Sequence, residues 1–169
     1  EMKAHLLIQA IGPELQQEII GYLRNEQRGA YRAAIDNLAV QKKLRPVFIQ
    51  KKTKEQQAAW LLDQLRVKSG DALAEQIMQI WLLKGQPKML GTFLDAIGVE
   101  HENGEVKTEL PETIEAAKAK AGIEALLKDH PAKHVALYMA IFQMQKAGGW
   151  PGITEAIAAH PELVLQPPT

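Results

Sequence analysis

Apolar residues at helical spacing are interrupted along this chain, at near-regular intervals, by junctions that contain glycine or proline. These junctions are Gly12-Pro13, Gly85-Gln86-Pro87, His130-Pro131 and Gly148-Gly149-Trp150-Pro151. Proline is tolerated in the first turn of a helix and glycine favours the end of one, so each junction is expected to stop one helix and start the next. The pattern predicts an all-α protein of about eight to ten helices, arranged as a multi-helix bundle or as a short stack of antiparallel helical hairpins.

Local patterns place some helix ends more closely. Thr53 and Gln56 have the spacing of a capping box, in which the two side chains satisfy backbone N–H groups reciprocally, so a helix should follow. Pro46 to Gln50 is predicted to form one short helical turn. Pro111 is predicted to open a longer helix, with Gly122 as a candidate break in it.

Two segments stand apart from the amphipathic pattern. Residues 131–147 are apolar on more than one helical face, which is typical of a helix in the middle of a bundle. Residues 99–110 could be extended, because Asn103-Gly104 resembles a hairpin turn between Val99 and Val106. The sequence leaves two alternatives there, a small β-hairpin or a polar loop, because an isolated two-stranded ribbon is only marginally stable.

Length and composition indicate one domain. The 169 residues, of which 46% are hydrophobic, are enough to build one core of ordinary size. We therefore expect a single all-α domain over residues 1–169. A weaker subdivision would separate basic N-terminal helices (1–70), a helical hairpin with an acidic loop (71–110) and C-terminal helices (111–169).

Similar short motifs recur about sixty residues apart. Ile80-Trp81 precedes Gly85 and Pro87 much as Ile141-Phe142 precedes Gly149 and Pro151. A helical-hairpin repeat would produce such echoes, and so would chance in helices rich in alanine and isoleucine. Both interpretations stay open at this point.

Charge is segregated along the chain although the net charge is zero. Residues 24–54 contain nine basic and two acidic side chains, whereas residues 95–115 contain seven acidic side chains and one lysine. The candidate residues for binding nucleic acid or an acidic partner are Lys42, Lys43, Arg45, Lys51 and Lys52. Stacking on nucleic-acid bases would require an exposed aromatic ring as well, but Tyr31 and Phe48 fall where core packing is expected.

The inventory of reactive groups is sparse. The chain has no cysteine, which excludes a disulfide scaffold and thiolate chemistry and is compatible with the cytoplasm. His130 and His134 have the i, i+4 spacing of helical metal ligands, but Pro131 places His130 at a helix boundary, so they are weak candidates for a metal site. No catalytic residue, metal or cofactor is predicted, and no apolar run is long enough to span a bilayer.

The sequence therefore favours a non-enzymatic interaction module of the cytoplasm that binds a protein partner or self-associates, and it predicts no membrane association. A nucleic-acid-binding protein that uses the basic 42–54 segment is the alternative. A small-molecule or metal-dependent enzyme with a site inside the bundle is a further alternative.

Overall fold

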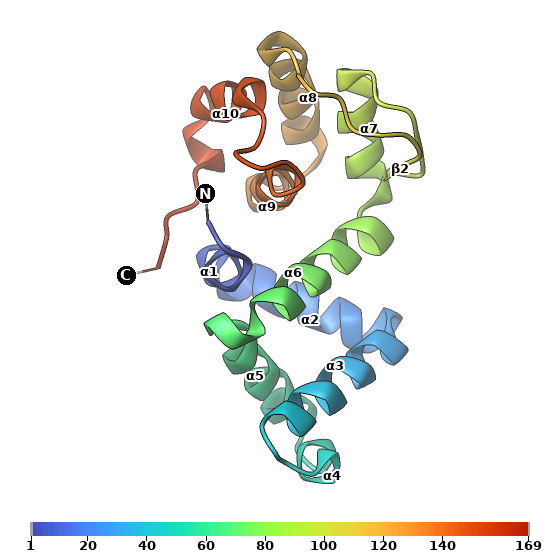
Figure 1. The fold of residues 1–169 in the computed structure, drawn as a ribbon, viewed down its shortest axis with the longest axis vertical. Helices are drawn as coiled ribbons and strands as arrows, with labels where there is room; N and C mark the ends of the chain where they lie inside the picture. The colour runs from blue at the N-terminus through green and yellow to red at the C-terminus, as the bar shows by residue number, and fades with distance from the viewer. Residues whose placement is uncertain (1, 169) are drawn as a thin grey trace. The chain divides into compact units, whose positions relative to one another are not determined.

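The computed structural model describes residues 2–168, and helices dominate it (Figure 1). In this part of the chain there are ten α-helices: α1 (Ala4–Ala10), α2 (Gly12–Glu26), α3 (Arg28–Gln41), α4 (Pro46–Gln50), α5 (Lys54–Leu65), α6 (Asp71–Ile80), α7 (Pro87–Ile97), α8 (Ala116–Asp129), α9 (Ala132–Gln143) and α10 (Pro151–Ala158). Shorter elements are the 3₁₀ turns η1 (Lys68–Gly70) and η3 (Pro161–Leu163), the π-helical segment η2 (Trp81–Gly85) and the strands β1 (His101–Glu102) and β2 (Glu105–Val106). The predicted all-α fold class is confirmed.

The described chain divides into two compact units. The N-terminal unit comprises Lys3–Met78 and the C-terminal unit comprises Gln79–Gln166, so the boundary falls inside α6. The single domain over residues 1–169 and its subdivision stay predictions, and residues 1 and 169 lie outside the described part.

In the N-terminal unit, α1 packs on α2, α2 on α3, and α3 on α4. The apolar stripes face inward as the helical spacing requires; in α2, Ile19, Ile20 and Leu23 are fully buried. The capping box before α5 is present, because the Thr53 hydroxyl accepts from the Gln56 N–H and the Gln56 carboxamide accepts from the Thr53 N–H, both at 3.1 Å. The local prediction at this helix start is confirmed.

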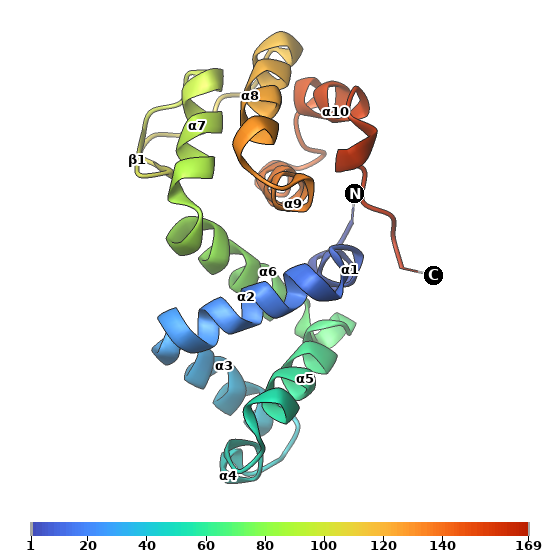
Figure 2. The ribbon, with the colours of Figure 1, turned by 180° about the vertical axis from the view of Figure 1, so that it is seen from behind.

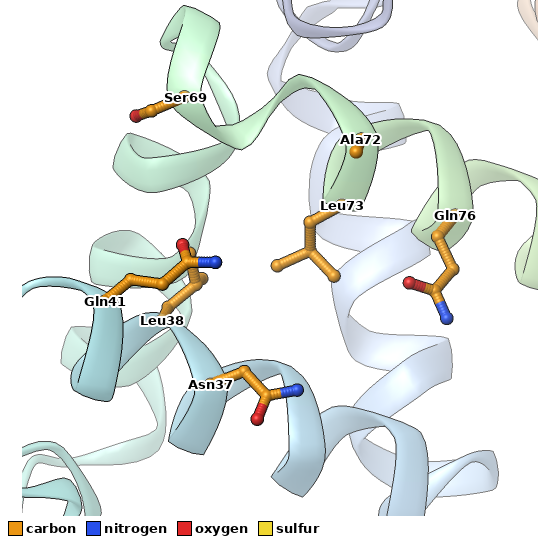
Figure 3. Close-up of a pocket in the computed structure, with 7 residues that line it drawn as sticks. All are labelled: Asn37, Leu38, Gln41, Ser69, Ala72, Leu73 and Gln76. Carbon is orange, nitrogen blue, oxygen red and sulfur yellow. The ribbon is translucent and has the colours of Figure 1, made fainter.

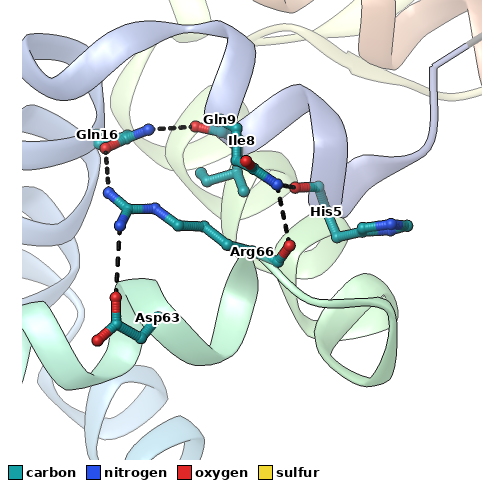
Figure 4. Close-up of polar contacts among 6 residues, drawn as sticks. All are labelled: His5, Ile8, Gln9, Gln16, Asp63 and Arg66. Carbon is teal, nitrogen blue, oxygen red and sulfur yellow. Dashed lines mark hydrogen bonds and ion pairs between the residues drawn. The ribbon is translucent and has the colours of Figure 1, made fainter. Parts of the chain in front are cut away.

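A buried amide links three helices of the N-terminal unit (Figure 4). Gln16 in α2 is only 4% exposed; its Nε2 donates to the Ile8 carbonyl in α1 at 2.6 Å, and its Oε1 accepts from Arg66 Nη2 at 3.0 Å. Arg66 follows α5, and its carbonyl accepts from Gln9 Nε2 at 3.0 Å. Each polar atom that Gln16 buries therefore has a partner, which removes the cost of burying an unpaired amide.

A carboxylate also ties the start of α6 to α1. Asp71 Oδ1 accepts from the backbone N–H of His5 at 2.9 Å and lies 2.7 Å from its Nδ1. Burial raises the pKa of Asp71, but the hydrogen bonds and the charge of His5 outweigh it, so the pKa lies below its ordinary value. The carboxylate is therefore ionised at neutral pH and helps to orient α1.

In the C-terminal unit, α8 packs closely against both α7 and α10 (Figure 1). Glycines permit close approaches here: a Cβ on Gly122 of α8 would lie 2.8 Å from the Phe93 ring of α7, and a Cβ on Gly152 of α10 would lie 2.0 Å from the carbonyl oxygen of Ile114, in the loop before α8. The expected break at Gly122 is wrong, because α8 continues through it. This glycine serves a helix crossing and does not end a helix.

The helix predicted to begin at Pro111 begins five residues later, at Ala116. Residues of the C-terminal part hold the preceding backbone: the indole N–H of Trp150 donates to the Pro111 carbonyl at 2.9 Å, and Lys146 donates to the Glu112 carbonyl. These tertiary hydrogen bonds override the local preference for a helix start at proline.

α9 carries the apolar centre of the C-terminal unit, with seven of its twelve residues buried. Tyr138 and Phe142 meet Phe93 of α7 edge to face, with ring centroids 5.7 and 5.5 Å apart. The Tyr138 hydroxyl donates to the Leu90 carbonyl at 3.3 Å, and burial raises the pKa of this phenol. Because other elements surround α9, apolar residues occupy more than one of its faces, as residues 131–147 predict.

Residues 101–106 form the small hairpin, which decides between the two alternatives for 99–110. Asn103 and Gly104 both have positive φ, 52° and 85°, as the tight turn between antiparallel strands requires. His101 docks the hairpin on α7: its Nε2 lies 2.7 Å from Asp95, and its Nδ1 accepts from the Gly104 N–H at 3.0 Å. This attachment stabilises a ribbon that would be marginal alone.

Replacement of Gly122 by alanine tests the close approach of α7 and α8. The added methyl group has no space beside Phe93 and Ala96, so Gly122→Ala should lower the free energy of unfolding by about 1–3 kcal/mol. Gly21→Ala is the matched control, because this glycine is also inside a helix but faces open space, and it should raise stability by about 0.5–1 kcal/mol. Urea denaturation of both variants measures the two effects, and a neutral or stabilising Gly122→Ala would contradict the assignment.

Candidate functional site

The predicted basic residues lie together at one end of the N-terminal unit, around α4 (Figure 2). Lys42, Lys43 and Arg45 occupy the turn before α4, while Lys51 and Lys52 follow it, and all five side chains are exposed. Lys54 adds a sixth cation at the start of α5, and no acidic residue occurs between Asp36 and Glu55. We call residues 40–54 the basic tip.

The turn that begins the basic tip is fixed by a left-handed residue. Lys43 has φ of 59°, the Leu44 N–H donates to the Ala39 carbonyl at 2.7 Å, and the Lys43 N–H donates to the Val40 carbonyl at 2.9 Å. This arrangement closes α3 in the manner of a Schellman motif, with lysine at the position that glycine usually occupies. The chain then reverses into Pro46, whose fixed φ suits the first turn of α4.

One side chain anchors α4. Ile49 is 2% exposed, whereas Val40, Leu44, Val47 and Phe48 are 65%, 40%, 43% and 58% exposed. A helix of five residues has only one side to bury, so burial of Ile49 leaves Val47 and Phe48 facing solvent. The basic tip therefore combines six cations with four large exposed apolar side chains.

The expected core position of Phe48 is wrong, whereas Tyr31 is buried as expected, with 7% exposure. Val47, Phe48 and Ile49 are consecutive apolar residues, and their order in the sequence does not show which of them is buried. Which of Val47, Phe48 and Ile49 is buried depends on the direction in which α4 leaves the turn at Lys43. The exposed ring removes the objection that the basic residues lack an accessible aromatic group.

A cavity of about 230 Å³ lies beside the basic tip in sequence and belongs to the same unit (Figure 3). It is lined by Asn37, Leu38, Gln41, Ser69, Ala72, Leu73 and Gln76, from α3, η1 and α6. Leu73 points into the space, which three carboxamides border, and none of the lining residues is ionisable. We call this cavity the amide groove. The sequence analysis did not predict it, although the i, i+4 spacing of Asn37 and Gln41 indicates that these two residues share one helix face.

The acidic residues of 95–115 belong to the C-terminal unit; Asp95 is in α7, and the others are in and around the hairpin and in the loop before α8. Two of them have ion-pair partners: Asp95 pairs with His101, and Glu102 lies 3.5 Å from Lys107 Nζ. The remaining carboxylates of this segment are exposed, so they lack the desolvation that would prepare one for proton transfer.

His130 is the C-cap residue of α8, and His134 is in the first turn of α9, so the two residues are not on one continuous helix. The His134 ring packs edge-on against Trp81, with centroids 4.9 Å apart. Among the described residues, no group of three or more histidine, aspartate or glutamate side chains could hold a metal ion. The two histidines stay weak candidates.

No protein-family model, curated protein or solved structure matches this chain. No helix between residues 2 and 168 combines the length and apolar character needed to cross a membrane.

The environment of His130 predicts a pH dependence of stability. Burial lowers the pKa of His130, Asp129 raises it, and His134 and Lys88 lower it further, so the net shift is downward from 6.5. The folded state therefore binds the imidazole proton of His130 less tightly than the unfolded state does. The free energy of unfolding should then be highest above pH 6.5 and should fall as the pH falls through the folded-state pKa. His130→Gln removes this contribution, so the stability difference between pH 8 and pH 5 should shrink in the variant. Urea denaturation at both pH values measures it, and an unchanged difference would refute the prediction.

Proposed function

We propose that this protein is a non-enzymatic interaction module whose basic tip binds a protein partner that presents acidic and apolar side chains together. The observation that carries the proposal is the mixture of exposed side chains within fifteen residues. Six cations and no carboxylate occur in residues 40–54, interleaved with Val40, Leu44, Val47 and Phe48. A surface of this composition complements an acidic partner by charge and offers apolar area for burial.

The two components have different roles in binding. Exposed ion pairs contribute little affinity individually, but complementary charge steers association and excludes other basic surfaces. Apolar side chains that become desolvated supply most of the binding free energy, and an aromatic residue near the centre of an interface is a frequent hot spot. Phe48 is the large aromatic side chain in the basic tip, so we assign it the anchoring role.

A second copy of the chain complements this surface less well than a separate partner does. The acidic segment 95–115 has the opposite charge. However, the large exposed hydrophobic residues of the described chain outside the basic tip are Val67, Leu83 and Val164, and none belongs to that segment. Basic-to-acidic contact between copies would satisfy the cations and leave the apolar side chains of the tip without partners.

Selection of binding peptides from a random phage-displayed library tests the proposal. Peptides that combine acidic and apolar residues should be enriched on the purified protein, and synthetic versions should bind at least tenfold more weakly to Phe48→Ala, a loss of about 1.4 kcal/mol. A variant with Lys42, Lys43, Arg45, Lys51 and Lys52 changed to glutamine should also lose binding.

Val164→Ala and the double variant Lys118→Gln/Lys120→Gln are matched controls, since they alter exposed residues elsewhere and should bind as the unaltered protein does. Failure to enrich such peptides, or equal binding to all variants, would overturn the proposal. Analytical ultracentrifugation distinguishes self-association: a concentration-dependent dimer abolished by the glutamine variant would identify a second copy as the occupant.

Single-stranded nucleic acid is a second candidate, favoured by the exposure of the Phe48 ring beside the cations. A base can stack on an aromatic ring while lysine and arginine contact phosphates. If this candidate is right, labelled single-stranded RNA or DNA should bind with an affinity that falls steeply with salt. Changing Lys42, Lys43, Arg45 and Lys52 to glutamine should flatten this dependence. Fluorescence anisotropy measures both quantities, and no detectable binding at low salt would reject the candidate.

A further inference from the structure

Three carboxamide side chains line the amide groove, two on one side and one on the other. Asn37 and Gln41 are four residues apart on α3, and Gln76 lies across from them on α6 (Figure 3). Residues four apart on a helix lie on the same face, so Asn37 and Gln41 form a row along one side. Leu38, which is 3% exposed, and Leu73 provide the apolar part of the lining.

These carboxamides are available to a ligand. Asn37, Gln41 and Gln76 are all exposed, so a ligand in the groove can reach their side chains. Each carboxamide has an NH₂ group that can donate to a peptide carbonyl and an oxygen that can accept from a peptide N–H. Because no lining residue is ionisable, the groove suits a neutral group, whereas the adjacent basic tip suits anions.

The spacing of the row also matches an extended chain. Four residues along a helix advance about 6 Å, and two residues along an extended strand advance about 6.6 Å. Successive peptide groups that point to the same side of an extended segment would therefore fall near Asn37 and Gln41. Leu73 would meet a side chain that points into the groove.

We propose that the amide groove binds the main chain of an extended segment of the partner, with the carboxamides paired to its peptide groups. The inference rests on the proposed function and specifies how the partner is held. Gln41 directly precedes Lys42, and Ser69 directly follows Lys68; both lining residues lie at the end of the groove away from Gln76, so cations adjoin that end in sequence (Figure 3). Acidic residues of the partner are therefore expected at one end of a short neutral stretch.

The test uses the peptides selected in the library experiment and the full-length protein. The double variant Gln41→Leu/Gln76→Leu should bind them at least tenfold more weakly, while Gln17→Leu, an exposed glutamine of α2, should leave the affinity unchanged. N-methylation of individual peptide nitrogens should identify one or two positions that weaken binding to the unaltered protein. At those positions the same methylation should have less effect on the double variant, because the pairing is already lost.

The outcomes separate this inference from the proposed function. Peptides that require the basic tip but bind equally well to Gln41→Leu/Gln76→Leu would overturn the role of the groove and leave the function of the tip intact. Failure to select any peptide would overturn both. If oligonucleotides lose affinity for the double variant and peptides do not, the occupant is a base rather than a peptide main chain. Circular dichroism of each variant confirms that it is folded.

Discussion

The candidate binding surface depends on the burial of a single side chain. Ile49 is the residue of α4 that enters the core, and Gln57 and Gln50 support this helix by donating to the Ile49 carbonyl and to Asp36. Since α4 has five residues, this anchor determines which side chains face water. Three consecutive apolar residues cannot all enter the core from one short helix, so burial of Ile49 exposes Val47 and Phe48 beside the cations.

The N-terminal unit contains both proposed contact surfaces. The basic tip offers charge and apolar area, and the amide groove offers hydrogen-bonding groups without charge. α3 links them, because it contributes Asn37 and Gln41 to the groove and ends at the turn that carries Lys42 and Lys43. In the same unit, the hydrogen bonds of Gln16 hold α1, α2 and the end of α5 together.

The C-terminal unit is stabilised differently. Its core is stabilised by the close helix contact at Gly122, by the close approach of Gly152 to the loop before α8, and by the aromatic rings that pack around Phe93. Its polar surface includes the acidic hairpin, which His101 attaches to α7.

The sequence by itself determined the elements whose causes are local. Proline and glycine placed most helix ends, and the Thr53 capping box was readable because its partners are three residues apart. Tertiary structure decided the start of α8, the continuity through Gly122, the exposure of Phe48 and the convergence of Asn37, Gln41 and Gln76. The start of α8, the continuity through Gly122 and the convergence of the three carboxamides depend on contacts between segments distant in sequence, such as the Trp150 hydrogen bond to Pro111 and the approach of α3 to α6. The exposure of Phe48 depends on the direction in which α4 leaves the turn at Lys43. Local spacing shows which face of a helix is apolar, but only packing determines what covers that face and which side chains remain for a partner.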